Sequence, residues 1–501
     1  MGNPEPTLRH FFVFYMSRIT SRVSVKLQAL KPWVVPAGFL CGIAIHSFFP
    51  LTTTPSSIYW ALVGLVCLLF FLRRTRISSF YLLLFLSLLS FGLFRFDLAI
   101  PKTPVSSEDE FIATVQDSSY GKFGWQAYVK TSENTFLIRA KRSLVIGSTI
   151  SFSCKPKVRT QGEDDYHLFV SFFKKYQAEC SPKIVMTIKP PAWWDVRQTF
   201  ADLRAWTNKR IMSAMSGDEG ALIAGMLYGE RGMSQQSNDL FRSAGLTHLI
   251  AVSGSNITIV ASVIFALLLG AGLWRRQAFW GTTIALASYV MFTGFSASVD
   301  RAAAMGWLVL LARHLGRQSQ TWRLLVLSAG ILCLIDPWML GFDAGFALSF
   351  LATLGLMIWT PIINRRLGFL HFDILREAAA TSIAATLMTT PYMALAFGRV
   401  SLAGIFTNLI AVPLVPWAML FGAMAAAWGN LIGWQVVSLP ALGVAKVIFF
   451  SASLANYVPF LNLEIQDMNL FLLVATYALL FIIYFRLRKE NDLYTETRLI
   501  C

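Results

Sequence analysis

The class of fold follows from one segment, Leu246-Thr-His-Leu-Ile-Ala-Val-Ser-Gly-Ser-Asn-Ile-Thr-Ile-Val-Ala-Ser-Val-Ile-Phe-Ala-Leu-Leu-Leu-Gly-Ala271. The segment contains no Asp, Glu, Lys or Arg. At about 1.5 Å per residue, it is long enough to cross a hydrocarbon layer of roughly 30 Å. Small and polar residues interrupt it at Ser253-Gly-Ser-Asn256, and it resumes at Ile257. The segment therefore predicts a membrane helix with a polar break.

The polar break has two readings. Polar side chains are costly where they face lipid, and irregular backbone at membrane depth occurs only inside protein or along a wet cavity. Discontinuous helices often mark the binding site of transporters. The break at 253–256 is therefore either a pore-lining position, or a loop or helix contact between two separate spans.

The composition of the whole chain agrees with a membrane protein. Of its 501 residues 55% are apolar and only 14% are charged, against about 25% in soluble domains. This excludes an ordinary soluble protein, a disordered chain and a coiled coil. Further apolar runs occupy residues 33–49, 58–72, 77–96, 278–294, 299–315, 322–335, 338–360, 378–397, 401–421, 423–437, 440–456 and 468–485. We expect a polytopic α-helical membrane protein.

The charge distribution predicts an orientation. The formal net charge is +16 at pH 7, an excess suited to membrane flanks or to the path of an anion. Basic residues gather before residue 33, at 73–76 and at 486–489. The positive-inside rule then places both termini in the cytoplasm and residues 97–190 outside.

Residues 97–190 have a different pattern, in which apolar and polar residues alternate. Five strands are predicted, at 111–115, 125–129, 135–139, 149–153 and 183–188, with a short helix near 166–176. Such a series predicts a small β-barrel or sandwich. The segment holds two cysteines, Cys154 and Cys180, and in an oxidising compartment we expect them to pair, the alternative being two free buried thiols.

Residues 193–212 form an amphipathic pattern with three tryptophans nearby. The pattern predicts a helix that lies in the membrane interface or packs on the β-domain.

Two further motifs place charge among apolar runs. Asp300 and Arg301 begin an Ala-rich run. They pair with each other or with partners on other helices, or else Arg301 presents its guanidinium to a phosphate. Gly341, Gly345, Ser349 and Thr353 recur every four residues, which predicts one smooth helix ridge. Asp343 lies one step off this ridge, where it needs a partner such as Arg301.

Several activities lack their motifs in this sequence. There is no P-loop for ATP, no HExxH and no close pair among the six histidines. We therefore expect no enzyme activity, no bound metal and no cofactor. A membrane enzyme that uses His248, Ser253 or Asp343 is disfavoured, because no nucleophile and base stand at readable spacing.

Seven motifs occur in an order that resembles the ComEC competence family, the inner-membrane DNA channel of natural transformation. They are Gly229-Glu-Arg231, Phe241-Arg-Ser-Ala-Gly-Leu-Thr-His248, Ala251-Val-Ser-Gly254, Asp300-Arg-Ala-Ala, Leu334-Ile-Asp-Pro337, Gly345-Phe-Ala-Leu-Ser-Phe350, and Gly398-Arg-Val-Ser401 followed by Asn408-Leu-Ile-Ala-Val-Pro413. The strand-rich segment resembles that family's outer oligonucleotide-binding (OB) domain with its cysteine pair. The resemblance implies single-stranded DNA as the substrate.

The resemblance also implies a division of the chain and a set of partners. The expected parts are a basic cytoplasmic N-terminus (1–32), three transmembrane helices (33–96), an extracytoplasmic OB-like β-domain (97–190), interfacial amphipathic helices (191–245), a competence-type channel core (246–485) and a cytoplasmic tail (486–501). The expected partners, besides membrane lipid, are a cytoplasmic helicase-like ATPase and an outer DNA receptor.

The chain departs from the family pattern in two ways. The family commonly has Ser-Gly-Leu-His where this chain has Ser253-Gly-Ser-Asn256, and an amide does not titrate near neutral pH. Many members carry a C-terminal metallo-β-lactamase-like domain, for which this sequence has neither room nor clustered histidines. We therefore expect no zinc nuclease here, and strand degradation by a nuclease in trans.

Two groups of residues are candidates for DNA contact. A single-strand binder needs a basic track and aromatic faces, and on the outer domain these are Lys122, Trp125, Lys130, Lys141 and Arg142. Candidates for the path through the membrane are Arg231, Arg242, His248, Ser253, Gly254, Asn256, Asp300, Arg301, Asp343 and Arg399. The alternative function is a permease for a small anionic solute, with the β-domain as a structural cap.

Overall fold

The computed structural model describes residues 34–48, 88–95, 110–121, 124–131, 135–141, 144–154, 157–158, 178–182, 185–190, 195–230, 232–250, 252–294, 297–315, 321–428, 434–455, 462–465 and 468–500. These fall into two compact units, one of residues 1–102 with 323–342, the other of residues 103–322 with 343–501. The predicted helix at 166–176 and the run at 58–72 lie outside the described residues, as does most of the run at 77–96.

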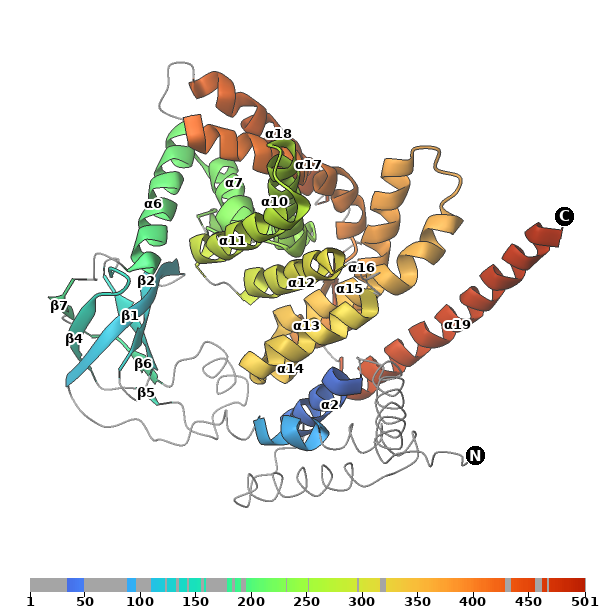
Figure 1. Cartoon of the computed structure of the whole chain (residues 1–501), viewed down its shortest axis with the longest axis horizontal. Coiled ribbons are helices and arrows are strands. Elements are labelled where there is room, and N and C mark those ends of the chain that lie inside the picture. Colours follow the sequence, from blue (N-terminus) through green and yellow to red (C-terminus); the bar gives the residue numbers. More distant parts are fainter. Residues whose placement is uncertain are drawn as a thin grey trace, which may run out of the picture. The chain divides into compact units, whose positions relative to one another are not determined.

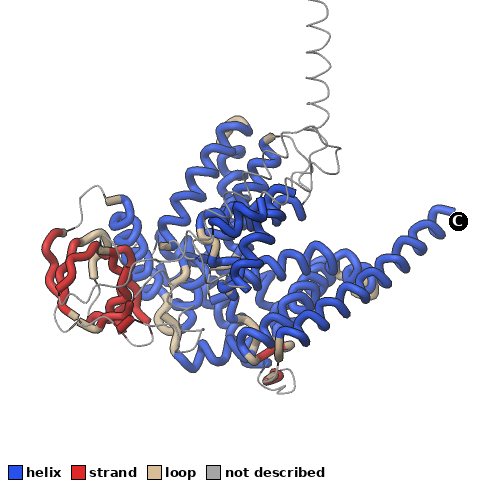
Figure 2. Tube along the Cα trace, turned by 90° about the horizontal axis from the view of Figure 1, so that it is seen from below, coloured by secondary structure: helices blue, strands red, loops and turns tan. Residues whose placement is uncertain are grey.

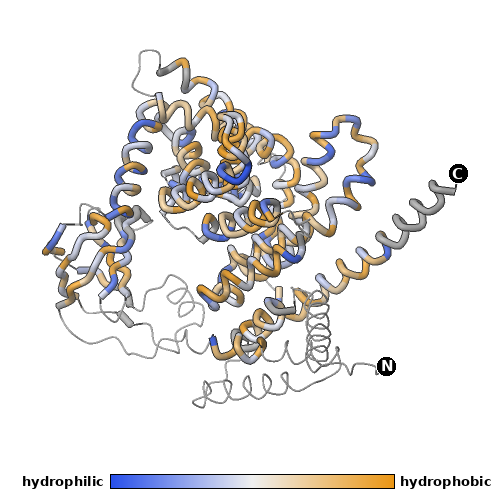
Figure 3. Tube along the Cα trace, in the orientation of Figure 1, coloured by the Kyte–Doolittle hydropathy of each residue, from blue (hydrophilic) through white to orange (hydrophobic). Residues whose placement is uncertain are grey.

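Long apolar helices dominate the larger unit (Figure 1). They are α10 (Gly254–Gly270), α11 (Arg275–Thr293), α12 (Ala297–His314), α15 (Ala344–Arg366), α16 (Asp373–Phe397), α17 (Gly404–Trp428), α18 (Trp434–Ala455) and α19 (Leu470–Ile500). In the described part of the chain, four stretches are long and apolar enough to cross a membrane: Ala344–Arg366, Gly404–Trp428, Ser438–Ala455 and Leu470–Leu487. Figure 3 shows apolar residues along these helices, as expected for a polytopic membrane protein.

The smaller unit contains α2 (Val34–Phe48), a helical segment at 88–95, most of α13 (Thr321–Ile335), and α14 (Trp338–Phe342). Gly42 and Gly92 allow the first two to touch, since a Cβ on Gly42 would lie 2.0 Å from the Leu89 carbonyl oxygen. Arg95 donates to the carbonyls of Leu334 and Ile335 at 3.0 and 2.9 Å. This arginine satisfies the free carbonyls at the end of α13.

All five predicted strands are present in the β-domain. The sheet contains β1 (Glu110–Gly121), β2 (Gly124–Lys130), β3 (Thr135–Ala140), β4 (Thr149–Ser153), β5 (Lys157–Val158), β6 (Ala178–Cys180) and β7 (Val185–Lys189), in the order β5-β6-β3-β2-β1-β4-β7. Every pairing is antiparallel except β3 with β6. The predicted closed barrel is not observed: among the described strands, β5 and β7 are the two edges of an open sheet.

The β-domain has its own apolar core on one face of the sheet. Phe111, Phe136 and Phe152 are buried with ring centroids 4.9 to 6.1 Å apart, and Figure 2 shows the strands curving around this region. The expected disulfide joins Cys154 and Cys180, with Cα atoms 6.0 Å apart. On β1 and β4 every second residue is buried, because a strand turns successive side chains to opposite sides.

Four helices follow the β-domain: α6 (Val196–Ala214) and the shorter α7 (Asp218–Tyr228), α8 (Gln235–Ser243) and α9 (Thr247–Ile250). Helix α6 is the predicted amphipathic helix, and Asp195 caps its first turn by accepting from the Arg197 backbone N–H at 3.0 Å. Most of α7 is buried, including Leu222, Ile223 and Met226, so it is a central element of the helical core.

Three expected boundaries were wrong. The run at 338–360 is not one helix, because the chain is extended at Asp343, between α14 and α15. Gly341 therefore lies on a different helix from Gly345, Ser349 and Thr353, and the predicted ridge is broken. The runs at 401–421 and 423–437 are divided elsewhere: α17 continues past Pro413 and Pro416 to Trp428.

Candidate functional site

Three helices begin close together, and they carry three of the sequence motifs described above. They are α10, which starts at Gly254, α12, which starts at Ala297, and α15, which starts at Ala344. A Cβ on Gly254 would lie 3.7 Å from the Ala302 Cβ, and the guanidinium of Arg301 contacts Asp343. We call this place, made of Ser253, Gly254, Asp300, Arg301 and Asp343, the helix junction.

The ion pair of the helix junction is buried. Arg301 Nη1 lies 2.8 Å from Asp343 Oδ2, and each side chain is only 6% exposed. Asp343 is the residue before α15, yet its carboxylate makes no capping bond to that helix because Arg301 engages it. Arg301 was one of the partners expected for Asp343, and the pairing lets both charges remain inside the protein.

Gly345 leaves the space that the ion pair occupies. A Cβ at this position would lie 3.0 Å from both Arg301 Nη2 and Asp343 Oδ1, which is tighter than most real contacts. Arg301 Nε is buried and has no hydrogen-bond partner among the described residues. The pair is therefore fitted closely on one side and leaves one donor unused on the other.

Asn256 supports a neighbouring helix. Its side chain is buried, its Nδ2 donates to the Met226 carbonyl at 3.0 Å, and its Oδ1 accepts from Ser253 Oγ at 2.9 Å. Tyr289 Oη donates to the adjacent Leu227 carbonyl at 2.5 Å. Both carbonyls belong to the last turn of α7, where helical partners are missing, so Asn256 and Tyr289 complete that helix end.

The polar break lies two to three residues earlier than predicted. Helix α9 ends at Ile250 and α10 begins at Gly254, so Asn256 lies inside the first turn of α10. Ser253 is half-buried, and its hydroxyl bonds to Asn256 instead of capping the helix. Gly254 is exposed. Among the described side chains of the predicted break, Ser253 and Gly254 are thus the ones within reach of a ligand.

The other path candidates that the structure describes are exposed. Arg242 pairs with Asp239 on α8 at 3.2 Å, with side chains 60% and 54% exposed. Arg399 pairs with Glu464 at 3.1 Å, joining the short strands β8 (Arg399–Ser401) and β9 (Asn462–Glu464). His248 is exposed on α9, and Arg231 lies outside the described residues.

Two sequence motifs meet at a second close contact. Gly245, after α8, has a φ of +71°, and a Cβ there would lie 2.8 Å from the Gly404 Cα. Ser401 Oγ donates to the Ser243 carbonyl at 2.7 Å, and Thr407 Oγ1 donates to the Ala244 carbonyl at 2.8 Å. The motif around 241–248 therefore packs on the motif around 398–413, about 160 residues later in the chain, and glycine is required where the backbones touch.

Sequence reasoning missed the arginines of α6. Arg197 Nη1 donates to Gln116 on β1 at 2.9 Å, and Arg210 Nη1 donates to the Ala427 carbonyl at the end of α17 at 2.9 Å. Between them, Arg204 Nη1 donates to the Thr293 carbonyl at the end of α11 at 3.4 Å. The amphipathic pattern predicted the helix, but these acceptors are between 81 and 217 positions away in sequence.

Asp218, at the start of α7 and outside the candidate spans, carries a shifted carboxyl group. Burial alone would raise its pKa, but hydrogen bonds from the Ser234 hydroxyl, the Ser237 hydroxyl and the Ser234 backbone N–H hold the pKa below its ordinary value. Donors that bond to the charged form favour that form. The carboxylate thereby ties the start of α7 to the start of α8.

The basic candidates of the β-domain are spread over the sheet. Lys130 is exposed at the end of β2, opposite Thr135 at the start of β3. Lys141 is exposed just beyond the other end of β3, roughly 20 Å away at about 3.3 Å per residue. Trp125 lies on β2 opposite Ala140, whereas Lys122 and Arg142 lie outside the described residues.

Comparison with known proteins places the helical part of the chain in a family. The model of the competence protein family matches residues 226–490, more than half of the chain. ComE operon protein 3 of Bacillus subtilis is 27% identical over 214 residues, which are 42% of this chain and 27% of that protein. Recombination protein 2 of Haemophilus influenzae is 24% identical over 281 residues, 50% of this chain and 34% of that protein.

A third relative is the uncharacterized protein YcaI of Escherichia coli, 26% identical over 240 residues, which are 42% of this chain and 29% of that protein. The matched stretches thus span about a third or less of the length of these relatives, and no solved structure matches. The family match contains the starts of α10, α12 and α15, and with them the whole helix junction. The chain belongs to the competence protein family, the ComEC type.

Proposed function

We propose that the helices of this chain form the passage through which single-stranded DNA crosses the cytoplasmic membrane during natural transformation. One observation carries the proposal: within the family match, three helices begin together at the helix junction, beside an exposed glycine. A role in DNA uptake follows from the family, and the passage itself is our inference from the geometry.

The helix junction suits a polyanion. Phosphates cannot cross hydrocarbon bare, and the start of a helix carries unpaired N–H groups with about half a positive charge. Ser253 and Asp343 make no side-chain capping bond to α10 and α15, so those N–H groups stay available. Gly254 has no side chain to hold a strand at a distance.

The same geometry divides the path candidates into two roles. Ser253 and Gly254 contact the strand, because they are at least partly exposed. Arg301, Asp343 and Asn256 hold the three helix starts in place, because each is buried and bonded to other protein groups. An arginine neutralised by a carboxylate shapes a passage more than it attracts phosphate.

The proposal includes a setting and partners. The chain acts as a conduit and not as an enzyme, with both termini in the cytoplasm and the β-domain outside. The driving force comes from a helicase-like ATPase or from the membrane potential. An outer receptor delivers the DNA, and a nuclease in trans removes the second strand. A permease for a small anion is the competing function, and no contact in the described residues favours it.

A bulk substitution tests the passage. Gly254→Trp introduces a large side chain at the helix junction, where a Cβ has room. We expect transformation to fall at least about tenfold, the effect of ~1.4 kcal/mol on a rate. The matched control is Gly270→Trp, at the other end of α10, where a Cβ would meet nothing within 4 Å.

Both variants are expressed in a deletion strain and compared at equal membrane levels by immunoblot. The control should transform like the unaltered chain. Normal uptake of DNA by the deletion strain itself would refute the proposed function. Equal transformation by the two tryptophan variants would refute the placement of the passage at the helix junction.

A further inference from the structure

A single row of polar residues crosses five strands of the β-domain. The residues of this row are directly opposite one another in the sheet register: Thr135 (β3), Lys130 (β2), Thr114 (β1), Thr149 (β4) and Lys189 (β7). A shift of register between Thr149 and Ile150 brings Lys189 opposite Thr149. We call these five residues the cross-strand row.

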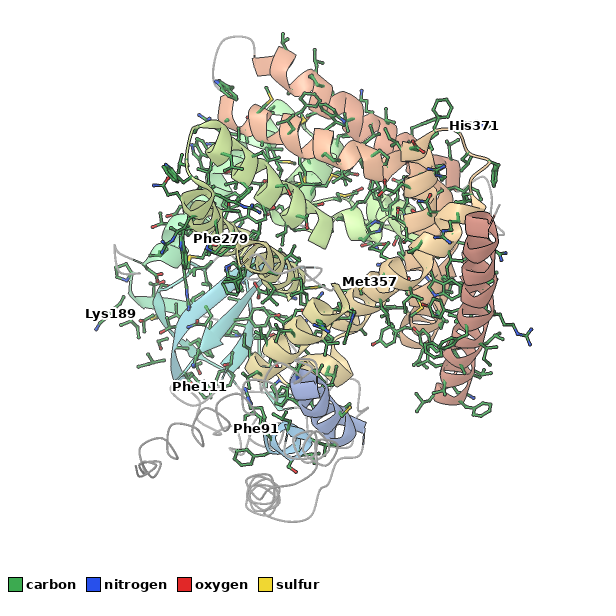
Figure 4. The ribbon with its side chains drawn as sticks, turned by 45° about the vertical axis from the view of Figure 1, so that its right-hand side comes forward. Phe91, Phe111, Lys189, Phe279, Met357 and His371 are labelled. Carbon is green, nitrogen blue, oxygen red and sulfur yellow. A yellow bond between two sulfur atoms is a disulfide. The ribbon has the colours of Figure 1, made fainter. Side chains whose placement is uncertain are left out.

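The cross-strand row is on the solvent face of the sheet. Its chain neighbours Val129, Phe136, Ala113 and Ile150 are all buried in the core. Because successive residues of a strand point to opposite faces, the four row residues on β3, β2, β1 and β4 face outward. Lys189 comes directly after the register shift on β7, a strand whose residues from Met186 to Lys189 are all exposed. Lys130 and Lys189 are exposed, and Figure 4 shows Lys189 pointing away from the margin of the sheet.

The chemistry of the cross-strand row fits an extended anion. Among the described residues, neither lysine is in an ion pair, so both ammonium groups are available. Adjacent strands are about 4.8 Å apart, which puts the two lysines roughly 14 Å apart. The threonine positions between them offer hydroxyl groups, which bind phosphate oxygens as lysines do.

A second row runs beside the first and is partly apolar. Ile112 on β1 lies opposite Ser151 on β4, which lies opposite Met186 on β7. Ile112 is 62% exposed and Met186 is 64% exposed. Two large apolar side chains on the solvent face, on the strands that flank β4, provide apolar contact for something other than phosphate, such as a base.

We propose that a single strand of DNA lies across the sheet along the cross-strand row, with its phosphates on Lys130, Lys189 and the threonines and its bases on Ile112 and Met186. This deepens the proposed function by naming the outer binding surface and rests on it for the identity of the polyanion. The apolar row is what favours nucleic acid over a sulfated polysaccharide or a lipid headgroup, which have no aromatic base to cover it.

The proposed surface differs from the basic track expected from the sequence. Lys189 was not among the expected contacts. The strand order places it in the same row as Lys130, although the two residues are far apart in sequence. Lys141 is roughly 20 Å from Lys130 along β3, at about 3.3 Å per residue, and lies off the row. Lys141 is therefore a natural control, since it is an exposed lysine of the same domain.

The charge part of the proposal is tested with the purified full-length protein in detergent. Binding of a fluorescent oligo(dT) is followed by anisotropy at several salt concentrations. Each phosphate contact contributes about 0.7 to the slope of log affinity against log salt for single strands. The double variant Lys130→Gln, Lys189→Gln should lower that slope by about 1.4, whereas Lys141→Gln should leave it unchanged.

The apolar part is tested with a second probe, an abasic oligomer of the same length. Ile112→Ser with Met186→Ser should weaken oligo(dT) binding about tenfold or more, because the two apolar side chains no longer bury surface against the bases. The same variant should bind the abasic oligomer as the unaltered chain does. All four side chains are exposed, so thermal unfolding should not change.

The outcomes separate this proposal from the function. Equal salt slopes for the double lysine variant and Lys141→Gln would overturn the row, even where the deletion strain fails to transform. Equal losses for oligo(dT) and the abasic oligomer would overturn the role of Ile112 and Met186. If heparin displaced the fluorescent oligo(dT) as well as unlabelled oligo(dT) does, the assignment to nucleic acid would be overturned. Normal transformation of the deletion strain would overturn the proposed function alone.

Discussion

The helix junction and the cross-strand row treat positive charge in opposite ways. At the junction Arg301 is 6% exposed and bonded to Asp343, so its charge is neutralised inside the protein. On the row Lys130 and Lys189 are exposed and outside any ion pair among the described residues. A charge among membrane helices needs a partner to be stable, whereas a charge on a solvent-exposed surface is hydrated and can remain unpaired until a ligand binds. The first kind of charge supports structure, and in our proposal the second supports binding.

The largest effect that tests this contrast is expected from Arg301→Ala. The substitution leaves Asp343 buried and unpaired, which costs about 3–5 kcal/mol. The yield of folded protein in detergent, measured by gel filtration, and its thermal unfolding temperature should both fall sharply. Arg399→Ala is the control, because its pair with Glu464 is 66% and 62% exposed and exposed pairs contribute ~0–1 kcal/mol. Equal stability of the two variants would contradict the buried role of Arg301.

Removing the second charge of the buried ion pair as well should recover part of the lost stability. The double variant Arg301→Ala, Asp343→Ala removes both charges, so no unpaired group remains. We expect it to be more stable than Arg301→Ala alone in the same unfolding assay. A double variant that is less stable than either single variant would mean that the two residues act independently.

A smaller effect is expected from Gly345→Ala. The added Cβ would lie 3.0 Å from both partners of the ion pair, and such overpacking typically costs about 1–3 kcal/mol. Gly254→Ala is matched to it, since the nearest atom to that Cβ is 3.7 Å away. Thermal unfolding should separate the two variants. A loss at Gly254 as large as that at Gly345 would break the distinction between a packed and an open side of the junction.

A comparable effect is expected from Asn256→Ala, which tests whether this position supports structure or contacts DNA. Without the amide, the Met226 carbonyl loses its donor inside the protein, which costs about 1–3 kcal/mol. Ser253→Ala removes a half-buried hydroxyl and should cost less. If Asn256→Ala kept full thermal stability but lost transformation, Asn256 would belong with the contact residues instead.

The smallest effect concerns Asp218, a carboxylate that is neither fully buried nor free. Its folded-state pKa is lowered, so its contribution to stability is complete above the ordinary pKa and is lost as pH falls through the folded value. Unfolding measured between about pH 6 and pH 3 should therefore show a shallower decline for Asp218→Asn than for the unaltered chain. Parallel pH curves for the two proteins would show that the serine contacts do not favour the charged form.

Local patterns predicted more of the fold than of the site. The five strands followed from alternation, and β1 and β4 show its cause most clearly, because every second residue of each enters the Phe111–Phe136–Phe152 core. That Asp343 needs a partner followed from the cost of a lone charge in a membrane span, whereas the choice of Arg301 among the possible partners came from the structure. The helix break at Asp343 did not, since small residues recur every four positions on both sides of it and continue the helical pattern.

The residues that sequence reasoning missed depend on contacts far along the chain. Asn256 bonds to a carbonyl 30 positions earlier, and the α6 arginines bond to helix ends up to 217 positions later. Lys189 becomes part of a surface only through the strand order that sets β7 beside β4. No local period carries such information, because it is created when distant segments are brought together.

The three arginines of α6 have a geometric consequence. One helix reaches the sheet through Arg197, the end of α11 through Arg204 and the end of α17 through Arg210. Because an α-helix turns about 100° per residue, one extra residue between Arg197 and Arg204 would swing the later two away from their carbonyls. The number of residues in α6 is thus fixed by these three contacts. Homologous chains should tolerate changes at the other surface positions of this helix, but no insertion or deletion.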